Sequence, residues 1–189
     1  MNKPRILIVE DEAIVARDIR QQLLQLGYDP VANIARGEEA VALAGELHPD
    51  LVLMDIHLAG KMDGIAAAQA IRERFALPVV FLAALAGDEM LNRAKLAEPF
   101  GCIIKPFEER ELRTVIEVAL YKHGAEVRLR QSHTEQEAIL RTALDGFWLI
   151  DMRGRILEVN DACSQMHGYS REEMVGKTIS DFEMEDSPE

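Results

Sequence analysis

The sequence predicts an α/β fold built on a doubly wound, five-stranded parallel sheet, and two observations carry this prediction. Five short apolar runs alternate with segments whose apolar residues recur at helical spacing, joined by short connections. Several of these runs are continuous, which is typical of strands buried on both faces. Right-handed crossovers would point all the strands the same way, so that their carboxyl ends meet at one edge of the sheet.

Each expected element rests on its own local pattern. The strands are runs rich in Val, Ile and Leu, expected at 5–9, 31–35, 51–55, 78–82 and 101–106. The helices carry apolar residues three or four positions apart, and they are expected at 14–26, 37–47, 64–75, 88–97 and 108–122. Gly27 ends the periodic pattern of the first helix, and 48–50 forms a turn before the third strand.

The ends of the strands indicate where the chemistry lies. The apolar run 51–54 leads directly into Asp55, and a carboxylate buried unpaired within such a strand would cost several kcal/mol. Asp55 is therefore expected at the carboxyl end of its strand, where open α/β sheets bind ligands. Glu10 and Asp11 follow the first strand and Lys105 ends the fifth, so three carboxylates and one lysine should converge there.

Clustered carboxylates repel one another unless a cation lies among them, and oxygen donors of this kind suit Mg²⁺. Asp11 and Asp55 are expected as direct ligands, with Glu10 acting through water. Lys105 would pair with a phosphoryl group as a compact point charge. The implied reaction is attack of the Asp55 carboxylate on phosphorus, which gives an acyl phosphate.

Four short motifs follow this edge in order: VEDE at 9–12, LMD at 53–55, MDG at 62–64 and IKPF at 104–107. With them, residues 1–123 resemble the receiver domain of two-component response regulators. The resemblance implies a flavodoxin-like sheet in the order 2-1-3-4-5. It also implies the roles of five residues: phosphoacceptor for Asp55, acidic metal pair for Glu10 and Asp11, site lysine for Lys105, and a metal-binding backbone carbonyl for His57. The phosphoryl donor would be a phosphohistidine on a histidine kinase or phosphotransfer protein.

Two positions depart from the family pattern. Ala83 stands where the family places Thr or Ser, and Cys102 stands where it usually places Tyr or Phe. Alanine has no donor to follow a phosphoryl group, and cysteine is too small to act as an aromatic lever, so we expect an impaired switch relay. Cys102 itself fits a small core residue. The loop after Asp55 is one residue longer than the common form and has Ala59 where Pro is frequent.

Beyond the receiver, we expect a helical linker at 124–144, continuing the fifth helix, and a partial sensor segment at 145–189. Strands at 147–151 and 155–160 flank a turn, and short helices follow at 162–166 and 171–175. This pattern resembles the front half of a PAS sensor domain, an α+β fold. Two strands alone do not form a stable sheet, so a truncated or vestigial fragment is expected, with Trp148 in its core.

Composition narrows the classes of function. A formal net charge of -12 argues against nucleic-acid binding, and no apolar run approaches the roughly 20 residues of a membrane span. Two cysteines are too few for a disulfide framework, so a cytoplasmic setting is the default.

Two functions remain open. The first is a phosphoacceptor module that is no enzyme beyond Mg²⁺-dependent phosphorylation and dephosphorylation of its own Asp55. The alternative is a degenerate receiver that acts as a phosphorylation-independent interaction module. A homodimer through the fourth and fifth helices is left open as a partner. Asp11 could also serve merely as a cap for the first helix.

Overall fold

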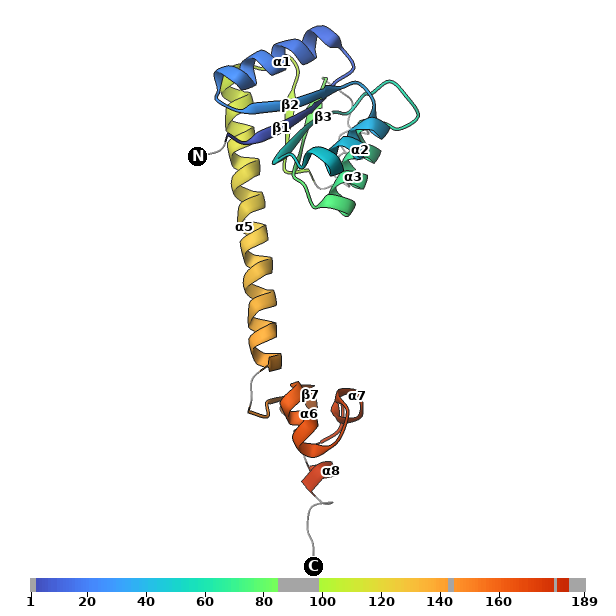
Figure 1. The fold of residues 1–189 in the computed structure, drawn as a ribbon, viewed down its shortest axis with the longest axis vertical. Coiled ribbons are helices and arrows are strands. Elements are labelled where there is room, and N and C mark those ends of the chain that lie inside the picture. Colours follow the sequence, from blue (N-terminus) through green and yellow to red (C-terminus); the bar gives the residue numbers. More distant parts are fainter. Residues whose placement is uncertain (1–2, 85–98, 143–144, 179, 184–189) are drawn as a thin grey trace, which may run out of the picture. The chain divides into compact units, whose positions relative to one another are not determined.

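The computed structural model describes residues 3–84, 99–142, 145–178 and 180–183. The chain divides into two compact units, Met1–Glu126 and Val127–Glu189. The first unit is the predicted doubly wound α/β fold, with helices on both faces of a parallel sheet (Figure 1). Among the described residues, no helix is both long enough and apolar enough to cross a membrane.

The sheet of the first unit has five parallel strands in the order β2-β1-β3-β4-β5, which confirms the expected topology. The strands are β1 (Arg5–Val9), β2 (Asp29–Ile34), β3 (Leu51–Asp55), β4 (Val79–Ala83) and β5 (Gly101–Ile104). Every residue of β3 and β4 is buried, as expected for continuous apolar runs in the centre of a covered sheet.

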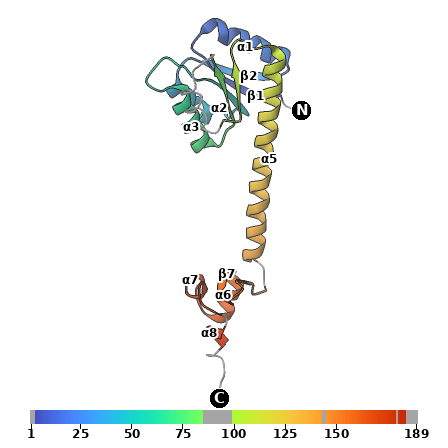
Figure 2. The same cartoon turned by 180° about the vertical axis from the view of Figure 1, so that it is seen from behind.

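Within the described part of the chain, two pairs of helices cover the sheet, and the two views show them on opposite faces (Figure 1 and Figure 2). The helices are α1 (Ala13–Gln25), α2 (Gly37–Leu47), α3 (Gly64–Phe75) and α5 (Glu109–Thr142). Side chains of α1 and α5 share one core cluster with β1, β3, β4 and β5, and those of α2 and α3 share the other with β1 to β4. The helix expected at 88–97 lies outside the described residues.

The second unit contains a short antiparallel hairpin and three short helices. Its elements are β6 (Trp148–Ile150), β7 (Ile156–Val159), α6 (Asp161–His167), α7 (Arg171–Met174) and α8 (Ser180–Glu183). Its core is small and consists of Ile156, Val159, Cys163, Met174 and Phe182. Trp148 is half-buried against this cluster, and its ring centroid lies 5.2 Å from that of His167.

Side-chain caps fix the starts of α6 and α7 in the second unit. The Asn160 side chain accepts a hydrogen bond from the Cys163 N–H at 2.9 Å and starts α6. Ser170 and Glu173 form a reciprocal capping box at the start of α7, which satisfies two backbone donors at once. α8 has only four residues and was not predicted from the sequence.

Candidate functional site

The acidic cluster forms where β1 and β3 end side by side. Val9 pairs with Met54 in the parallel register, so the next residues, Glu10 and Asp55, are neighbours at the carboxyl edge. One carboxylate oxygen each from Glu10, Asp11 and Asp55 lies within 4.8 Å of the others. Glu10 is 2% and Asp55 4% exposed, whereas Asp11 is an exposed residue. The structure therefore brings together the three carboxylates that the sequence predicted.

Lys105 connects two of these carboxylates. It follows β5, and its backbone N–H donates to the Ala83 carbonyl at 2.7 Å, which continues the pairing of β5 with β4. Its Nζ lies 2.6 Å from Glu10 Oε2 and 2.7 Å from Asp55 Oδ2. Among the described residues, this one ammonium group bridges the ends of β1 and β3, although β5 lies two strands from β3 and three strands from β1 in the sheet.

Each carboxylate of the cluster also accepts a backbone hydrogen bond. Glu12 N–H donates to Glu10 Oε1 at 3.3 Å, and His57 N–H donates to Asp55 Oδ1 at 3.0 Å. Ala59 N–H donates to Asp11 Oδ2 at 3.2 Å. Two of these three donors come from the loop between β3 and α3, a contact that the sequence analysis did not predict.

Burial and charge shift the protonation of this cluster. Burial, reinforced by the nearby Asp55 carboxylate, raises the pKa of Glu10 to about 7, although its bond to Lys105 opposes the shift. Burial alone would lower the pKa of Lys105, but hydrogen bonds and charges from Asp55 and Glu10 outweigh it and raise that pKa. Lys105 is thus held as a cation, which offsets the negative charge that Glu10 and Asp55 place in a buried edge.

Gly64 allows α3 to begin directly beneath Asp55. A Cβ at position 64 would fall on the carbonyl oxygen of Asp55, so only glycine permits this approach. Asp63 caps the helix by accepting the Ala66 N–H at 2.8 Å, and Gly64 N–H donates to the Ile56 carbonyl at 3.1 Å. The motif at 62–64 therefore has a structural basis: it returns the chain to the sheet right after the acidic strand end.

Comparison with known proteins places this arrangement in a family. The model of the response regulator receiver domain matches residues 6–117, and a model of the PAS fold matches residues 134–189. This chain belongs to the response regulator receiver domain family. The receiver is followed by a PAS segment, and such domains belong to two-component signal transduction.

The receiver has relatives among regulators and among solved structures. The transcriptional regulatory protein PdtaR of Mycobacterium tuberculosis is 40% identical over 117 residues, which cover 61% of this chain and 56% of that protein. The signal receiver domain of a modulated diguanylate cyclase from Desulfovibrio desulfuricans is 39% identical with a TM-score of 0.64, covering 66% of this chain and 99% of that structure.

A third relative is the N-terminal domain of a response regulator/sensory box/GGDEF three-domain protein from Carboxydothermus hydrogenoformans. It is 39% identical with a TM-score of 0.60, covering 65% of this chain and 98% of that structure. This chain spans about half the length of the curated relatives it matches.

The receiver's two altered positions lie on neighbouring strands. Ala83 ends β4, is buried, and offers only a methyl group to the edge. The interpretation of Cys102 as a core residue is wrong, because the structure exposes it on β5. β5 is the edge strand, and its alternation buries Ile103 against α5 while Cys102 faces the opposite side.

The alternative role of Asp11 as a helix cap is also wrong. The N-cap residue of α1 is Glu12, and no side chain caps that helix end. The Asp11 carboxylate instead accepts the Ala59 N–H from the loop after β3. In this receiver, Asp11 is therefore part of the acidic edge and contributes no cap to α1.

Proposed function

We propose that this receiver is a phosphoacceptor module of a two-component phosphorelay, in which Asp55 receives a phosphoryl group from a phosphohistidine. The donor would be a histidine kinase or a phosphotransfer protein. The supporting observation is the position of Lys105 Nζ, 2.7 Å from Asp55 Oδ2, with Glu10 and Asp11 in the same cluster. This arrangement provides a nucleophile and a cation at one point of the sheet edge.

The proposed transfer uses groups that the chain itself supplies. A carboxylate oxygen of Asp55 forms a bond to phosphorus as the phosphorus–nitrogen bond of the donor breaks, and the imidazole leaves with a proton from solvent. Lys105 pairs with the incoming phosphoryl oxygens because it is held as a cation beside Asp55. The product is an acyl phosphate on Asp55, and water later hydrolyses it. Beyond this self-modification we propose no enzymatic activity.

The donor set at the edge fits Mg²⁺. Carboxylate oxygens of Asp11 and Asp55, Glu10 through water, and the backbone carbonyl of His57 are hard ligands from separate turns of the chain. When bound, Mg²⁺ would neutralise charge on the carboxylates and on the transferred phosphoryl group. Asp11 and Asp55 would hold the ion directly.

A labelling experiment on the full chain tests the acceptor. With Mg²⁺ and a small phosphodonor such as phosphoramidate, the wild-type chain should gain one acid-stable, base-labile phosphoryl group, detected by intact-mass spectrometry. Asp55→Asn should gain none. Asp18→Asn, which removes a carboxylate from the exposed face of α1, is the matched control and should be labelled like wild type. Equal labelling of the Asp55 variant would refute the assignment.

A second candidate function is a phosphorylation-independent interaction module, and Ala83 and Cys102 favour it. Ala83 provides no hydroxyl at the edge, and Cys102 provides no aromatic ring. NMR titration of the full chain with beryllofluoride and Mg²⁺ separates the two functions. Shifts at the acidic cluster support the acceptor function, and shifts confined to it indicate binding without relay. No shift at all supports the second function.

The double variant Ala83→Thr, Cys102→Tyr probes the relay itself. Restoring both groups should extend the beryllofluoride-induced shifts towards residues 88–97, since the hydroxyl can then follow the phosphoryl mimic. An unchanged spectrum in that segment would count against an impaired relay.

We also propose a domain division for the whole chain: a receiver at 1–123, a helical linker at 124–144 and a partial PAS segment at 145–189. A chain with this order resembles the receiver and sensory-box parts of the Carboxydothermus protein. The proposed setting is the cytoplasm, with a kinase or phosphotransfer protein as partner and no nucleic acid.

A further inference from the structure

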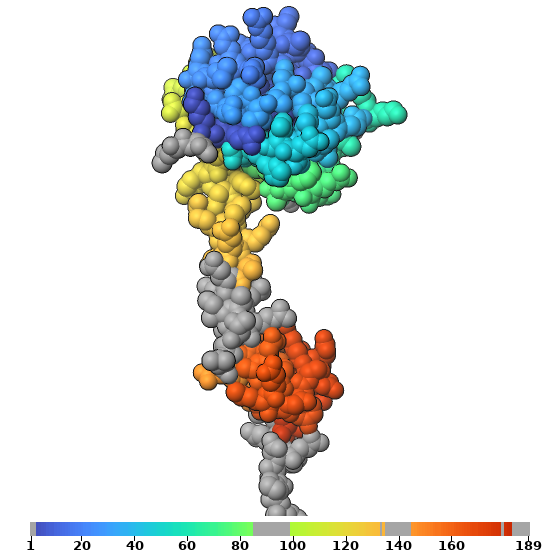
Figure 3. Space-filling view, in the orientation of Figure 1, coloured from blue at the N-terminus to red at the C-terminus, as the bar shows by residue number. Residues whose placement is uncertain are grey.

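The loop between β3 and α3, residues 56–63, contacts the acidic cluster through a backbone hydrogen bond from Ala59. It protrudes from the surface of the first unit, in turquoise-green beside α2 and α3 (Figure 1 and Figure 3). From this loop, the Ala59 N–H donates to Asp11 Oδ2 at 3.2 Å. A proline at position 59 would have no N–H to donate, whereas alanine has one. The contact therefore depends on the residue type at position 59.

The backbone donor matters more for the position of the Asp11 carboxylate than for the positions of Glu10 and Asp55. Lys105 binds Glu10 and Asp55, and both of these carboxylates are buried and cannot turn away. Asp11 is exposed, and no cationic side chain among the described residues forms an ion pair with it. Repulsion from two nearby carboxylates favours rotation of an exposed aspartate side chain into solvent. The backbone bond from Ala59 opposes that rotation.

We propose that the main-chain N–H of Ala59 is a positioning group that holds the Asp11 carboxylate within the acidic cluster and so preorganises the cluster for a divalent cation. Oδ2 is occupied by the amide, which leaves Oδ1 of the same carboxylate for the cation. Naming the cation Mg²⁺ rests on the proposed function. The hydrogen bond itself does not, because it is present without any ion.

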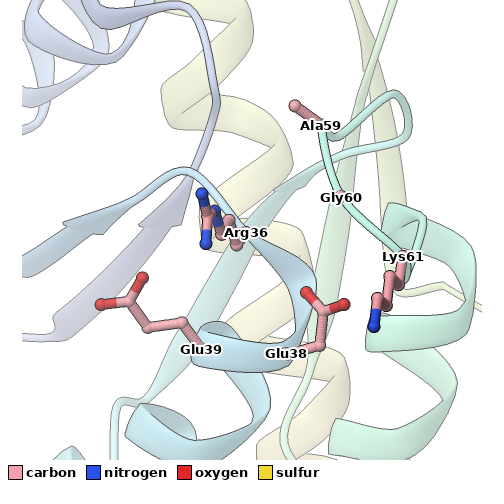
Figure 4. Close-up of a pocket in the computed structure, with 6 residues that line it drawn as sticks. All are labelled: Arg36, Glu38, Glu39, Ala59, Gly60 and Lys61. Atoms are coloured by element: carbon pink, nitrogen blue, oxygen red, sulfur yellow. The ribbon is translucent and has the colours of Figure 1, made fainter.

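The same loop connects the cluster to a surface pocket. Ala59, Gly60 and Lys61 form one wall of a cavity of about 510 Å³. Arg36, Glu38 and Glu39, at the start of α2, form the other wall (Figure 4). Ala59 belongs both to this wall and to the Asp11 contact, so we expect a change at Asp11 to reach the pocket through this residue. Cation binding should therefore alter the pocket wall as well as the cluster.

The first test uses the full chain without metal. If Ala59 N–H is bonded to a carboxylate, its amide should exchange with solvent at least about tenfold more slowly in the wild type than in Asp11→Asn. Its proton resonance should move upfield in that variant because an amide oxygen is a weaker acceptor. Asp18→Asn should change neither. Identical exchange and resonance of Ala59 in Asp11→Asn would overturn the proposal.

The second test measures Mg²⁺ affinity by NMR titration of the full chain. Groups that orient a metal ligand typically change affinity about 10- to 100-fold, and for this exposed contact we expect Ala59→Pro to weaken Mg²⁺ binding about tenfold. Ala59→Ser keeps the N–H and should stay within about twofold of wild type. In wild type, Mg²⁺ should also shift the Gly60, Lys61 and Glu38 resonances, and it should do so less in Ala59→Pro.

The outcomes separate this inference from the proposed function. Wild-type affinity in Ala59→Pro, or an equal loss in Ala59→Ser, would overturn the positioning role while leaving the phosphoacceptor proposal intact. Absence of Mg²⁺ binding in wild type would overturn the proposed function, and the metal-free exchange measurement would still decide the Ala59–Asp11 contact. If Ala59→Pro does not fold, as judged by its amide spectrum, that same measurement decides.

Discussion

At the scale of single residues, the site is organised by one lysine between two buried carboxylates. Glu10 and Asp55 would repel each other strongly at the end of a covered sheet, and Lys105 lies within 2.7 Å of an oxygen of each. Removing one partner of a buried ion pair is far more costly than the net value of the pair, because the remaining charge is left uncompensated. We therefore expect Lys105 to stabilise this edge of the sheet as well as to serve the proposed phosphoryl transfer.

Lys105→Met should destabilise the metal-free chain by about 3 kcal/mol, because it leaves two buried carboxylates without a cation. Urea unfolding followed by circular dichroism measures the loss. Added Mg²⁺ should restore part of it by supplying positive charge at the same place. Lys122→Met, at an exposed position of α5, should stay within about 0.5 kcal/mol of wild type. A Lys105 variant as stable as this control would contradict the charge argument.

The pKa of Glu10 predicts a pH dependence with a definite sign. Its folded-state pKa is raised from 4.5 to about 7, so its contribution to stability is fully present below pH 4.5 and is lost as the pH rises towards 7. In the metal-free chain, wild type should therefore lose up to about 3 kcal/mol more between pH 4.5 and 8 than Glu10→Gln does. Glu46→Gln, on the exposed end of α2, should keep the wild-type slope. Parallel curves for wild type and Glu10→Gln would exclude a raised pKa.

The sequence was sufficient to place the charged side chains but not the backbone donors. An apolar strand that ends in Asp55 predicts that this carboxylate lies at the edge of the sheet, because a charge inside the strand would be buried. The same reasoning places Lys105 at the end of the fifth strand. The Ala59 N–H is different, because whether a main-chain amide reaches Asp11 depends on the path of a loop. Cys102 was misjudged for a related reason: residue type indicated burial, while its position on an edge strand decided otherwise.

At the scale of elements, the start of α3 is set by a steric limit. Gly64→Ala would place a methyl group on the Asp55 carbonyl oxygen and should cost about 2–4 kcal/mol in urea unfolding, with the largest amide shifts at 55 and 56. Gly27→Ala is the matched substitution, because a Cβ there meets no atom within 4 Å and only the φ of +88° is unfavourable. It should cost about 1–2 kcal/mol and leave the acidic edge unshifted. Equal effects of both variants at Asp55 would contradict the steric argument.

Helix α5 carries exposed apolar side chains that the receiver core does not use. Val118, Tyr121 and Leu129 are 44%, 74% and 74% exposed, and with Ala125 they follow steps of three and four residues along one stripe. We expect self-association through this stripe, measurable by analytical ultracentrifugation. Tyr121→Glu with Leu129→Glu should give a monomer, whereas Ile14→Glu on α1, also exposed, should not change the mass. A monomeric wild type at high micromolar concentration would exclude this contact.

Most elements could be predicted because their patterns are long and regular. The periodic segments at 37–47 and 64–75 coincide with α2 and α3, and the continuation of the fifth helix beyond residue 122 is present in α5. α7 and α8 each have four residues, too few to show a helical period. Of the two, α7 begins with the Ser170–Glu173 capping box, and α8 was not predicted. Strand limits moved by a residue or two where Pro or a turn residue lies at the boundary, as at Pro30 in β2.

At the scale of the whole molecule, the two units differ greatly in the core that each can bury. The first unit has two clusters on either side of a complete sheet, and the second has one small cluster under a two-stranded hairpin. The hairpin also leaves Leu149, Ile150 and Leu157 about half exposed. Two strands with so little cover are marginally stable in water, so the units should open with different free energies.

Hydrogen exchange followed by mass spectrometry should show this difference in the full chain. Peptides from β1, β3 and β4 should exchange slowest, and those from β6 and β7 should exchange at least about 100-fold faster. Mg²⁺ at 100 times its dissociation constant should add about 2.7 kcal/mol of protection to the first unit. The second unit should not respond. Equal protection of both units, or a response of β6 and β7 to Mg²⁺, would contradict independent units.

Because Lys105 is shared between two carboxylates, it bears on the order of events in the proposed phosphoryl transfer. An ammonium head carries three hydrogens, and two of them point at Glu10 and Asp55 here. No hydrogen-bond partner for the third is found among the described residues, so in the proposed transfer it could donate to an incoming phosphoryl oxygen while both existing bonds remain. In that case Lys105 could bind the phosphoryl oxygen before it releases Glu10 or Asp55. Neither carboxylate would then be without a hydrogen bond to the ammonium group during the transfer.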